Sequence, residues 1–279
     1  MQPREMSIAP QFMPHEGLSI RYAVSPRPGA ESVIMFSPWP ESIYAFAPVW
    51  PALASEFSLA AVDLPGFGQS EGRPELMAPH AMGEFTVGIA AKLGLDQPHA
   101  VGPDVGTGAL LFAAARHPAA FRSVIVGAGA ATFPLCVDGA LKAFIDAASI
   151  DDFAAADPAE IIRDAVGRIS NYAVPDAVRD DYLQSYSGRR FLESIAYVRS
   201  YPMDLAALAP SLPYLSTPVQ IIVGRDDPYG LAADGELLHE QLPHSRLDVL
   251  DCGHNAWEEA AARYGSVATA WIGGGYAEV

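Results

Sequence analysis

Six short runs of apolar residues, rich in valine and isoleucine, recur along the chain with helix-length segments between them. They lie at residues 33–36, 59–62, 100–102, 124–126, 219–223 and 247–250. Strands that are apolar along their whole length are buried on both faces, and strands that alternate with helices usually pair in parallel. The pattern therefore predicts an α/β protein with a mainly parallel sheet flanked by helices. An earlier run, 18–24, alternates in polarity and is expected to be an antiparallel edge strand.

This rhythm breaks between residues 126 and 219, where we find helical patterns and no convincing strand, at 139–148, 158–170, 176–187 and 190–200. We expect a helical insertion over the carboxyl edge of the sheet, after which the chain returns to the sheet through Pro202, Pro210, Pro213 and Pro218. The predicted organisation is a core domain in two parts with a helical lid between the sixth and seventh core strands, at 1–128, 129–215 and 216–279 respectively.

The charge of the chain limits its partners. Seventeen Lys and Arg against 33 Asp and Glu give a formal net charge of −16, which repels nucleic-acid phosphate and anionic lipid. We therefore expect a small apolar or neutral substrate, with neither nucleic acid nor membrane as a partner. The sequence is also compatible with a homodimer. No apolar run reaches the length of a membrane span and the start lacks the apolar stretch of a signal peptide, so we expect a cytoplasmic protein.

Cofactor chemistry finds no support in the sequence. Cys136 and Cys252 are too few for a zinc cluster or a disulfide framework and are expected to be free thiols. Neither a phosphate-cradling glycine loop nor metal-ligand spacing is present in the sequence, so we predict no cofactor and no metal.

One segment has the pattern of a reactive turn. Residues 99–116 read as strand, sharp turn and helix, with Gly102 and Gly106 two residues on either side of Asp104. Glycines so placed permit a cramped strand-to-helix turn that pushes the central side chain into a cleft, as in a nucleophile elbow. Asp is also a good helix N-cap, so this segment alone fits either a nucleophile or a capped turn.

Four segments together resemble the α/β-hydrolase superfamily, in its branch with an aspartate nucleophile, the epoxide hydrolases and haloalkane dehalogenases. Residues 36–42 (Phe-Ser-Pro-Trp-Pro-Glu-Ser) are similar to the oxyanion loop of that branch, and the other similar segments are 63–70, 224–228 and 252–254. The resemblance implies the α/β-hydrolase fold, with Asp104 as nucleophile, Asp227 as triad acid and His254 as base, in the superfamily's chain order. It also implies that the backbone N–H groups of Trp39 and Val105 form the oxyanion hole.

An aspartate nucleophile restricts the reaction. Attack by a carboxylate on an ester would give an anhydride that collapses back, whereas attack on a saturated carbon gives an alkyl ester that His254 and water can hydrolyse. The electrophile is then an epoxide or a carbon that carries a halide. An ester or lactone hydrolase is disfavoured because the elbow has neither Ser nor Cys.

The leaving group decides between the two electrophiles. Dehalogenases of the family place a Trp directly after the nucleophile, where this chain has Val105, although Trp39 could donate to a halide instead. The epoxide hydrolases use lid tyrosines as proton donors, and the family's Tyr position before Arg199 is Val198 here, so the candidates are Tyr186, Tyr197 and Tyr201. We therefore expect an epoxide hydrolase that works through an aspartyl ester. The alternatives are a hydrolytic haloalkane dehalogenase and a non-catalytic binder of small ligands, the latter because Ser37-Pro38 replaces the family's His-Gly.

Overall fold

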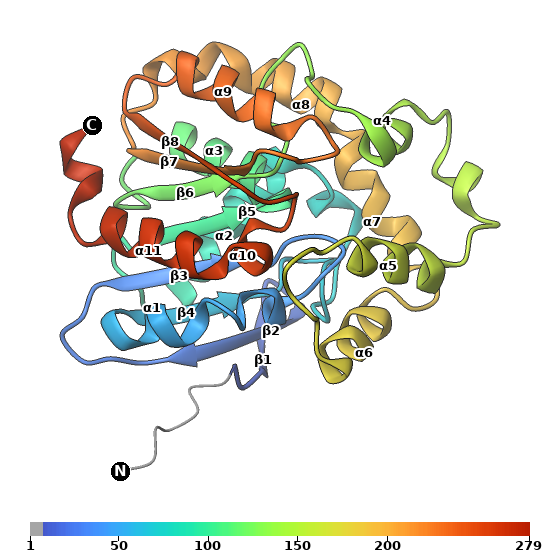
Figure 1. Cartoon of the computed structure of the whole chain (residues 1–279), viewed down its shortest axis with the longest axis horizontal. Coiled ribbons are helices and arrows are strands. Elements are labelled where there is room, and N and C mark those ends of the chain that lie inside the picture. Colours follow the sequence, from blue (N-terminus) through green and yellow to red (C-terminus); the bar gives the residue numbers. More distant parts are fainter. Residues whose placement is uncertain (1–7) are drawn as a thin grey trace.

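An eight-stranded sheet forms the centre of the structure, a computed structural model that describes residues 8–279 (Figure 1). Its strand order is β1-β2-β4-β3-β5-β6-β7-β8, in which β1 and β2 run antiparallel to their neighbours and the other pairs are parallel. The strands are β1 (Gln11–His15), β2 (Leu18–Ser25), β3 (Ser32–Phe36), β4 (Ser58–Val62), β5 (His99–Pro103), β6 (Val124–Gly127), β7 (Val219–Gly224) and β8 (Ser245–Leu250). The predicted mainly parallel sheet is confirmed.

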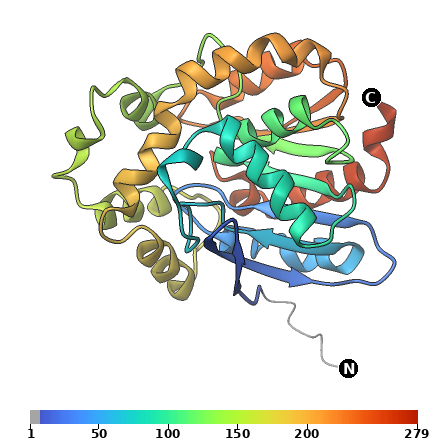
Figure 2. The ribbon, with the colours of Figure 1, turned by 180° about the vertical axis from the view of Figure 1, so that it is seen from behind.

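The two faces of the sheet carry separate apolar cores. Side chains alternate along β3, so Ile34 and Phe36 pack into one core while Val33 and Met35 pack into the other. Helices α2 (Pro79–Lys92), α3 (Val105–Arg116) and α9 (Leu231–Gln241) cover the first face, and Figure 2 brings α2 and α3 in front of the sheet. The other face is covered by α1 (Trp50–Glu56), α10 (Ala256–Glu259) and α11 (Ala261–Ile272).

All six predicted apolar runs are strands, but strand β1 was not predicted. Strand 18–24 is antiparallel as expected, yet the edge position belongs to β1. Because β1 is largely exposed and contains Pro14, it lacks the apolar pattern on which the prediction depended. Pro202 was predicted to return the chain to the sheet, and this is wrong: it lies in the first turn of a helix, where its missing N–H has no partner to lose.

Five α-helices stand between β6 and β7 in the chain; the first four lie beyond the carboxyl ends of the parallel strands (Figure 1), whereas the fifth packs against α2 and α3. They are α4 (Gly139–Asp146), α5 (Pro158–Gly167), α6 (Asp176–Ser185), α7 (Arg190–Arg199) and α8 (Tyr201–Leu208). Asp181 of α6 binds the buried Arg21 of β2 at 2.8 Å, and Arg190 of α7 donates to the carbonyl oxygens of Gly68 and Ser70 at 2.8 and 2.9 Å. These polar contacts attach α6 and α7 to the core.

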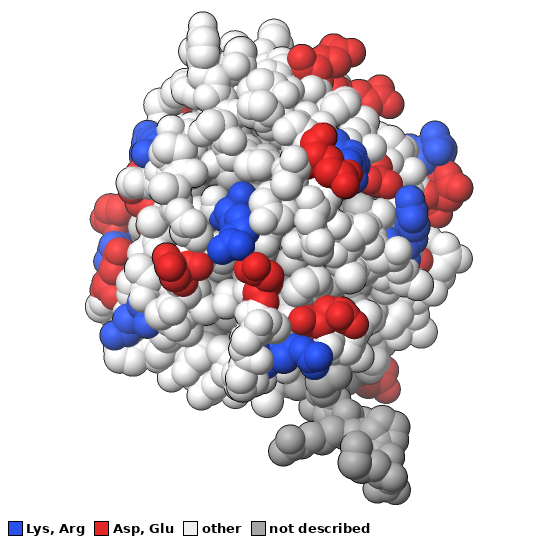
Figure 3. All heavy atoms as spheres, turned by 90° about the vertical axis from the view of Figure 1, so that its left-hand side faces the viewer, with Lys and Arg blue, Asp and Glu red and all other residues white. Residues whose placement is uncertain are grey.

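Acidic and basic side chains are interspersed on the face of the described chain shown in Figure 3. No helix within residues 8–279 combines the length and the apolar character that crossing a membrane requires.

Candidate active site

Asp104 occupies a strained turn between β5 and α3, with φ 53° and ψ −120°. Few non-glycine residues adopt a positive φ, and such strain is concentrated at functional sites. The turn closes because its neighbours are small: a Cβ on Gly102 would lie 2.7 Å from Leu110 Cδ1, and one on Gly129 would lie 2.0 Å from the carbonyl oxygen of Asp104. The Asp104 side chain makes no capping hydrogen bond to α3, so the alternative role of helix N-cap is not supported.

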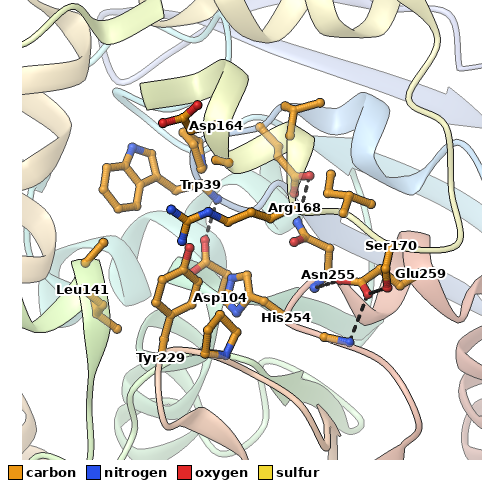
Figure 4. A pocket seen from close by; sticks show the side chains of 18 of the residues that line it. Trp39, Asp104, Leu141, Asp164, Arg168, Ser170, Tyr229, His254, Asn255 and Glu259 are labelled. Atoms are coloured by element: carbon orange, nitrogen blue, oxygen red, sulfur yellow. Dashed lines mark hydrogen bonds between the residues drawn. The ribbon is translucent and has the colours of Figure 1, made fainter. Parts of the chain in front are cut away.

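Two backbone N–H groups lie beside this carboxyl group. The N–H of Trp39 donates to Asp104 Oδ2 at 2.5 Å (Figure 4), and the N–H of Val105 lies close enough to the carboxyl group to oppose the rise in its pKa. These are the two groups expected to form the oxyanion hole. Pro38, which has no N–H, stands one residue before the donor and removes nothing from the pair.

The loops after β7 and β8 bring Asp227 and His254 together. His254 Nδ1 lies 2.8 Å from Asp227 Oδ2, and the other oxygen of this fully buried carboxylate accepts the N–H of Tyr229 at 2.8 Å. With Nδ1 directed at a carboxylate, Nε2 of the imidazole is the nitrogen left for acid–base chemistry. His254 and Asp104 line the same cavity (Figure 4). Nucleophile, base and acid of the expected triad are thus at one site.

The pKa values of Asp104 and His254 are both raised. The rise favours a neutral carboxyl group on Asp104 but a charged imidazole on His254. Burial raises the pKa of Asp104 to about 6, although the charge of His254 and the two N–H donors oppose that rise. Burial on its own would lower the pKa of His254, but the ion pair with Asp227 and the charge of Asp104 raise it to about 9. Esterification of Asp104 would remove one of these negative charges, so the imidazole would lose its proton more readily once an ester has formed.

A buried pair of carboxyl groups supports the segment after His254. Glu41 accepts from Asn255 Nδ2 at 3.1 Å and from Trp257 Nε1 at 3.2 Å. Burial and the adjoining Glu258 raise the pKa of Glu41 well above its usual range, so this pair is expected to retain a proton at neutral pH.

A cavity of about 580 Å³ opens in front of Asp104 and His254 (Figure 4). Its apolar wall comes from the oxyanion loop and from α4, α5 and α7, and includes Trp39, Leu141, Phe144, Ile161, Val166, Ile169 and Phe191. Such a mostly apolar cavity with a few convergent polar groups is typical of a small-molecule site. Within residues 8–279, no group of three or more His, Cys, Asp or Glu side chains is arranged to hold a metal ion.

The three lid tyrosines predicted as proton donors do not line this cavity. The Tyr186 hydroxyl donates to the carbonyl of Glu41 at 3.0 Å and accepts the N–H of Gly68, while the Tyr197 hydroxyl donates to the carbonyl of Val105 at 2.8 Å. Tyr201 is buried and its ring packs against that of Tyr197, with centroids 5.8 Å apart. These side chains face the core, so their placement does not support the expected role.

Tyr229 and Arg168 are two of the polar lining residues that the sequence analysis missed. The Tyr229 ring packs edge-on against His254, with centroids 4.9 Å apart, and its hydroxyl is directed toward Arg168 (Figure 4). Burial raises the pKa of the Tyr229 phenol and the charge of Arg168 opposes that rise. Tyr229 could have been found from its position two residues after Asp227, the predicted triad acid. The sequence around Arg168 does not indicate the direction of its side chain.

The indole of Trp39 contacts two residues of α7. Its Nε1–H donates to Ser194 Oγ at 2.8 Å, and its ring stacks on Phe191 with centroids 5.5 Å apart. A halide would have to displace Ser194 to use this donor.

Comparison with known proteins agrees with this architecture. A family model described as the alpha/beta hydrolase fold matches residues 31–261. An uncharacterized hydrolase of Bacillus subtilis, YugF, is 26% identical over 257 residues, which cover 88% of this chain and 90% of YugF.

Two solved structures are similar over nearly the whole chain. Haloalkane dehalogenase DbeA of Bradyrhizobium elkani superposes with a TM-score of 0.82 at 19% identity, covering 98% of this chain and 100% of the dehalogenase. Cfl2 of Burkholderia cenocepacia superposes with a TM-score of 0.81 at 19% identity, covering 97% of each chain. At such identity these likenesses establish the fold alone.

Proposed function

This chain belongs to the alpha/beta hydrolase fold family, and on that premise we propose that it opens a small-molecule epoxide to a diol through a covalent ester on Asp104. Family membership supports a hydrolytic activity. The observation that carries the finer proposal is the residue at the elbow: a carboxyl group, with one oxygen held by the backbone N–H of Trp39, lines the cavity beside His254.

In the first step Asp104 Oδ1, which is not held by Trp39, attacks a ring carbon of the epoxide. The bond from that carbon to the ring oxygen breaks, and the oxygen takes a proton from the hydroxyl of Tyr229, the tyrosine that lines the cavity. The phenolate that results lies beside the guanidinium of Arg168, which stabilises its charge.

In the second step His254 removes a proton from water, and the hydroxide adds to Cγ of Asp104. The N–H groups of Trp39 and Val105 stabilise the oxyanion that develops, while Asp227 stabilises the imidazolium. The tetrahedral intermediate then breaks its bond to the alkyl oxygen, which takes the proton from His254. The carboxylic acid left on Asp104 returns a proton to Tyr229 through solvent, so one water is consumed for each diol formed.

The two alternatives have less support. Val105 has no donor in its side chain and the indole of Trp39 is engaged by Ser194, so a departing halide would find little stabilisation. A non-catalytic binder would have no need of a strained carboxylate beside a His–Asp pair.

The test uses a His254→Gln variant, in which the ester forms but is not hydrolysed. With a panel of aryl and alkyl epoxides, we expect intact-mass analysis to detect an adduct of protein plus epoxide, located on the peptide that contains Asp104. Asp104→Asn is the control and should form none. The proposal fails if wild-type enzyme turns over an epoxide while His254→Gln never acquires an adduct, or if the panel is inert and haloalkanes release halide instead.

A further inference from the structure

Arg168, directly after α5, is the only Lys or Arg among the described residues that line the cavity. Within residues 8–279 no acidic side chain lies within 4.0 Å of its guanidinium. Asp164, one helical turn earlier, is the natural surface partner for such an arginine, but its carboxylate is turned away from the guanidinium (Figure 4). Arg168 instead extends across the cavity toward Tyr229 (Figure 4).

Several acidic groups that line the cavity already have partners. Glu259 accepts from the N–H groups of Gly253 and Asn255 and from the hydroxyl of Ser170. Asp251 binds Arg225 at 2.9 Å. Asp104 is held by the oxyanion loop and attracted by His254. Arg168 differs from these three groups, because the described chain supplies no carboxylate within salt-bridge distance of it.

We propose that the substrate supplies this carboxylate: the enzyme acts on an epoxide that carries a carboxylate on or next to the ring, and Arg168 binds that group. This deepens the proposed function and rests on it. A guanidinium presents a planar fork of N–H donors that matches both oxygens of a carboxylate. Because Tyr229 lies beside Arg168 and is the donor assigned to the ring oxygen, the two oxygen-bearing groups of the substrate must be neighbours. The apolar wall then accommodates the rest of the molecule.

The net charge of −16 led to the expectation of a small apolar or neutral substrate, whereas this proposal gives the substrate a negative charge. Exposed charges farther away than about 8 Å are largely screened at physiological ionic strength, whereas a contact with Arg168 inside the cavity is screened much less.

The first test measures binding, without turnover. Cinnamate and cinnamamide have the shape of a phenyl-substituted epoxide, cannot be opened, and differ in charge. By calorimetry we expect wild-type protein to bind cinnamate at least about tenfold more tightly than cinnamamide. Arg168→Gln should abolish this preference, while Arg163→Gln, at an arginine of α5 that does not line the cavity, should keep it. Equal affinities in the wild type, no binding of either compound, or a preference that persists in Arg168→Gln would each overturn the inference.

The second test uses phenylglycidate and phenylglycidamide as substrates. We expect kcat/KM to favour the acid about tenfold or more, and Arg168→Gln to remove the preference mainly through KM. If both epoxides turn over at equal kcat/KM, the carboxylate inference fails and the proposed function stands. If neither turns over and the cinnamate preference still depends on Arg168, the anion site stands and the proposed function fails.

Discussion

Replacement of Tyr229 by Phe is the sharpest perturbation of the proposed mechanism. The Phe ring keeps the edge-on contact with His254, centred 4.9 Å away, and the backbone N–H still donates to Asp227, so the triad should stay assembled. Only the hydroxyl beside Arg168 is lost. A positioned general acid contributes about 10²- to 10⁴-fold to a rate. At about 1.4 kcal/mol per factor of ten, the barrier to ring opening should rise by about 3 to 5 kcal/mol.

The assay follows ester formation by rapid quench and mass analysis in a His254→Gln background, where the second step is blocked. Tyr197→Phe and Tyr201→Phe are the matched controls, since both hydroxyls belong to buried side chains outside the cavity lining. We expect their ester-formation rates to stay within about threefold of the parent. Tyr197→Phe should instead lower the free energy of unfolding by about 1 to 3 kcal/mol, because the carbonyl of Val105 loses its partner. Unchanged ring opening in Tyr229→Phe together with a collapse in either control would refute the assignment of the donor.

Three further predictions address the charges and packing around the site. Ester formation should rise with pH through a midpoint near 6, because Asp104 attacks only when ionised and burial raises its pKa; rapid-quench rates giving a midpoint near 4 would contradict this. Gly129→Ala should lower the unfolding free energy in urea by more than about 2 kcal/mol, because the added Cβ meets the Asp104 carbonyl at 2.0 Å, whereas Gly167→Ala meets nothing within 4 Å and should be neutral. Arg21→Gln should cost about 3 to 5 kcal/mol in thermal unfolding by leaving Asp63 and Asp181 without their cation, and the exposed Arg263→Gln about 0.5 kcal/mol or less.

The strands could be predicted from the sequence because a strand that is buried on both faces is a short, continuous run of apolar residues. The run 219–223 is apolar along most of its length, and every residue of β7 is buried. The exposed β1 lacks this apolar pattern. Pro202 is compatible both with the end of a helix and with the first turn of a new one, and the sequence around it does not distinguish the two.

The position of the proposed triad could be predicted for a related reason. Asp104, Asp227 and His254 each follow a parallel strand, and parallel strands deliver their carboxyl ends to one edge of the sheet. The proposed proton donor could not be predicted because packing orients a tyrosine on a helix. Tyr197 lies on the expected helix, but its ring packs against Phe67, with centroids 5.4 Å apart, and does not line the cavity.

A single turnover in heavy-oxygen water tests the covalent step most directly. With enzyme in excess over an epoxide that it opens, hydrolysis of the ester at Cγ transfers the solvent oxygen to Asp104 and leaves the first diol molecules unlabelled. We predict that the peptide containing Asp104 gains one heavy oxygen, and that the label reaches the diol only in later turnovers. A labelled diol from the first turnover with an unlabelled Asp104 would mean that water attacks the epoxide directly, and the aspartyl ester would have to be abandoned.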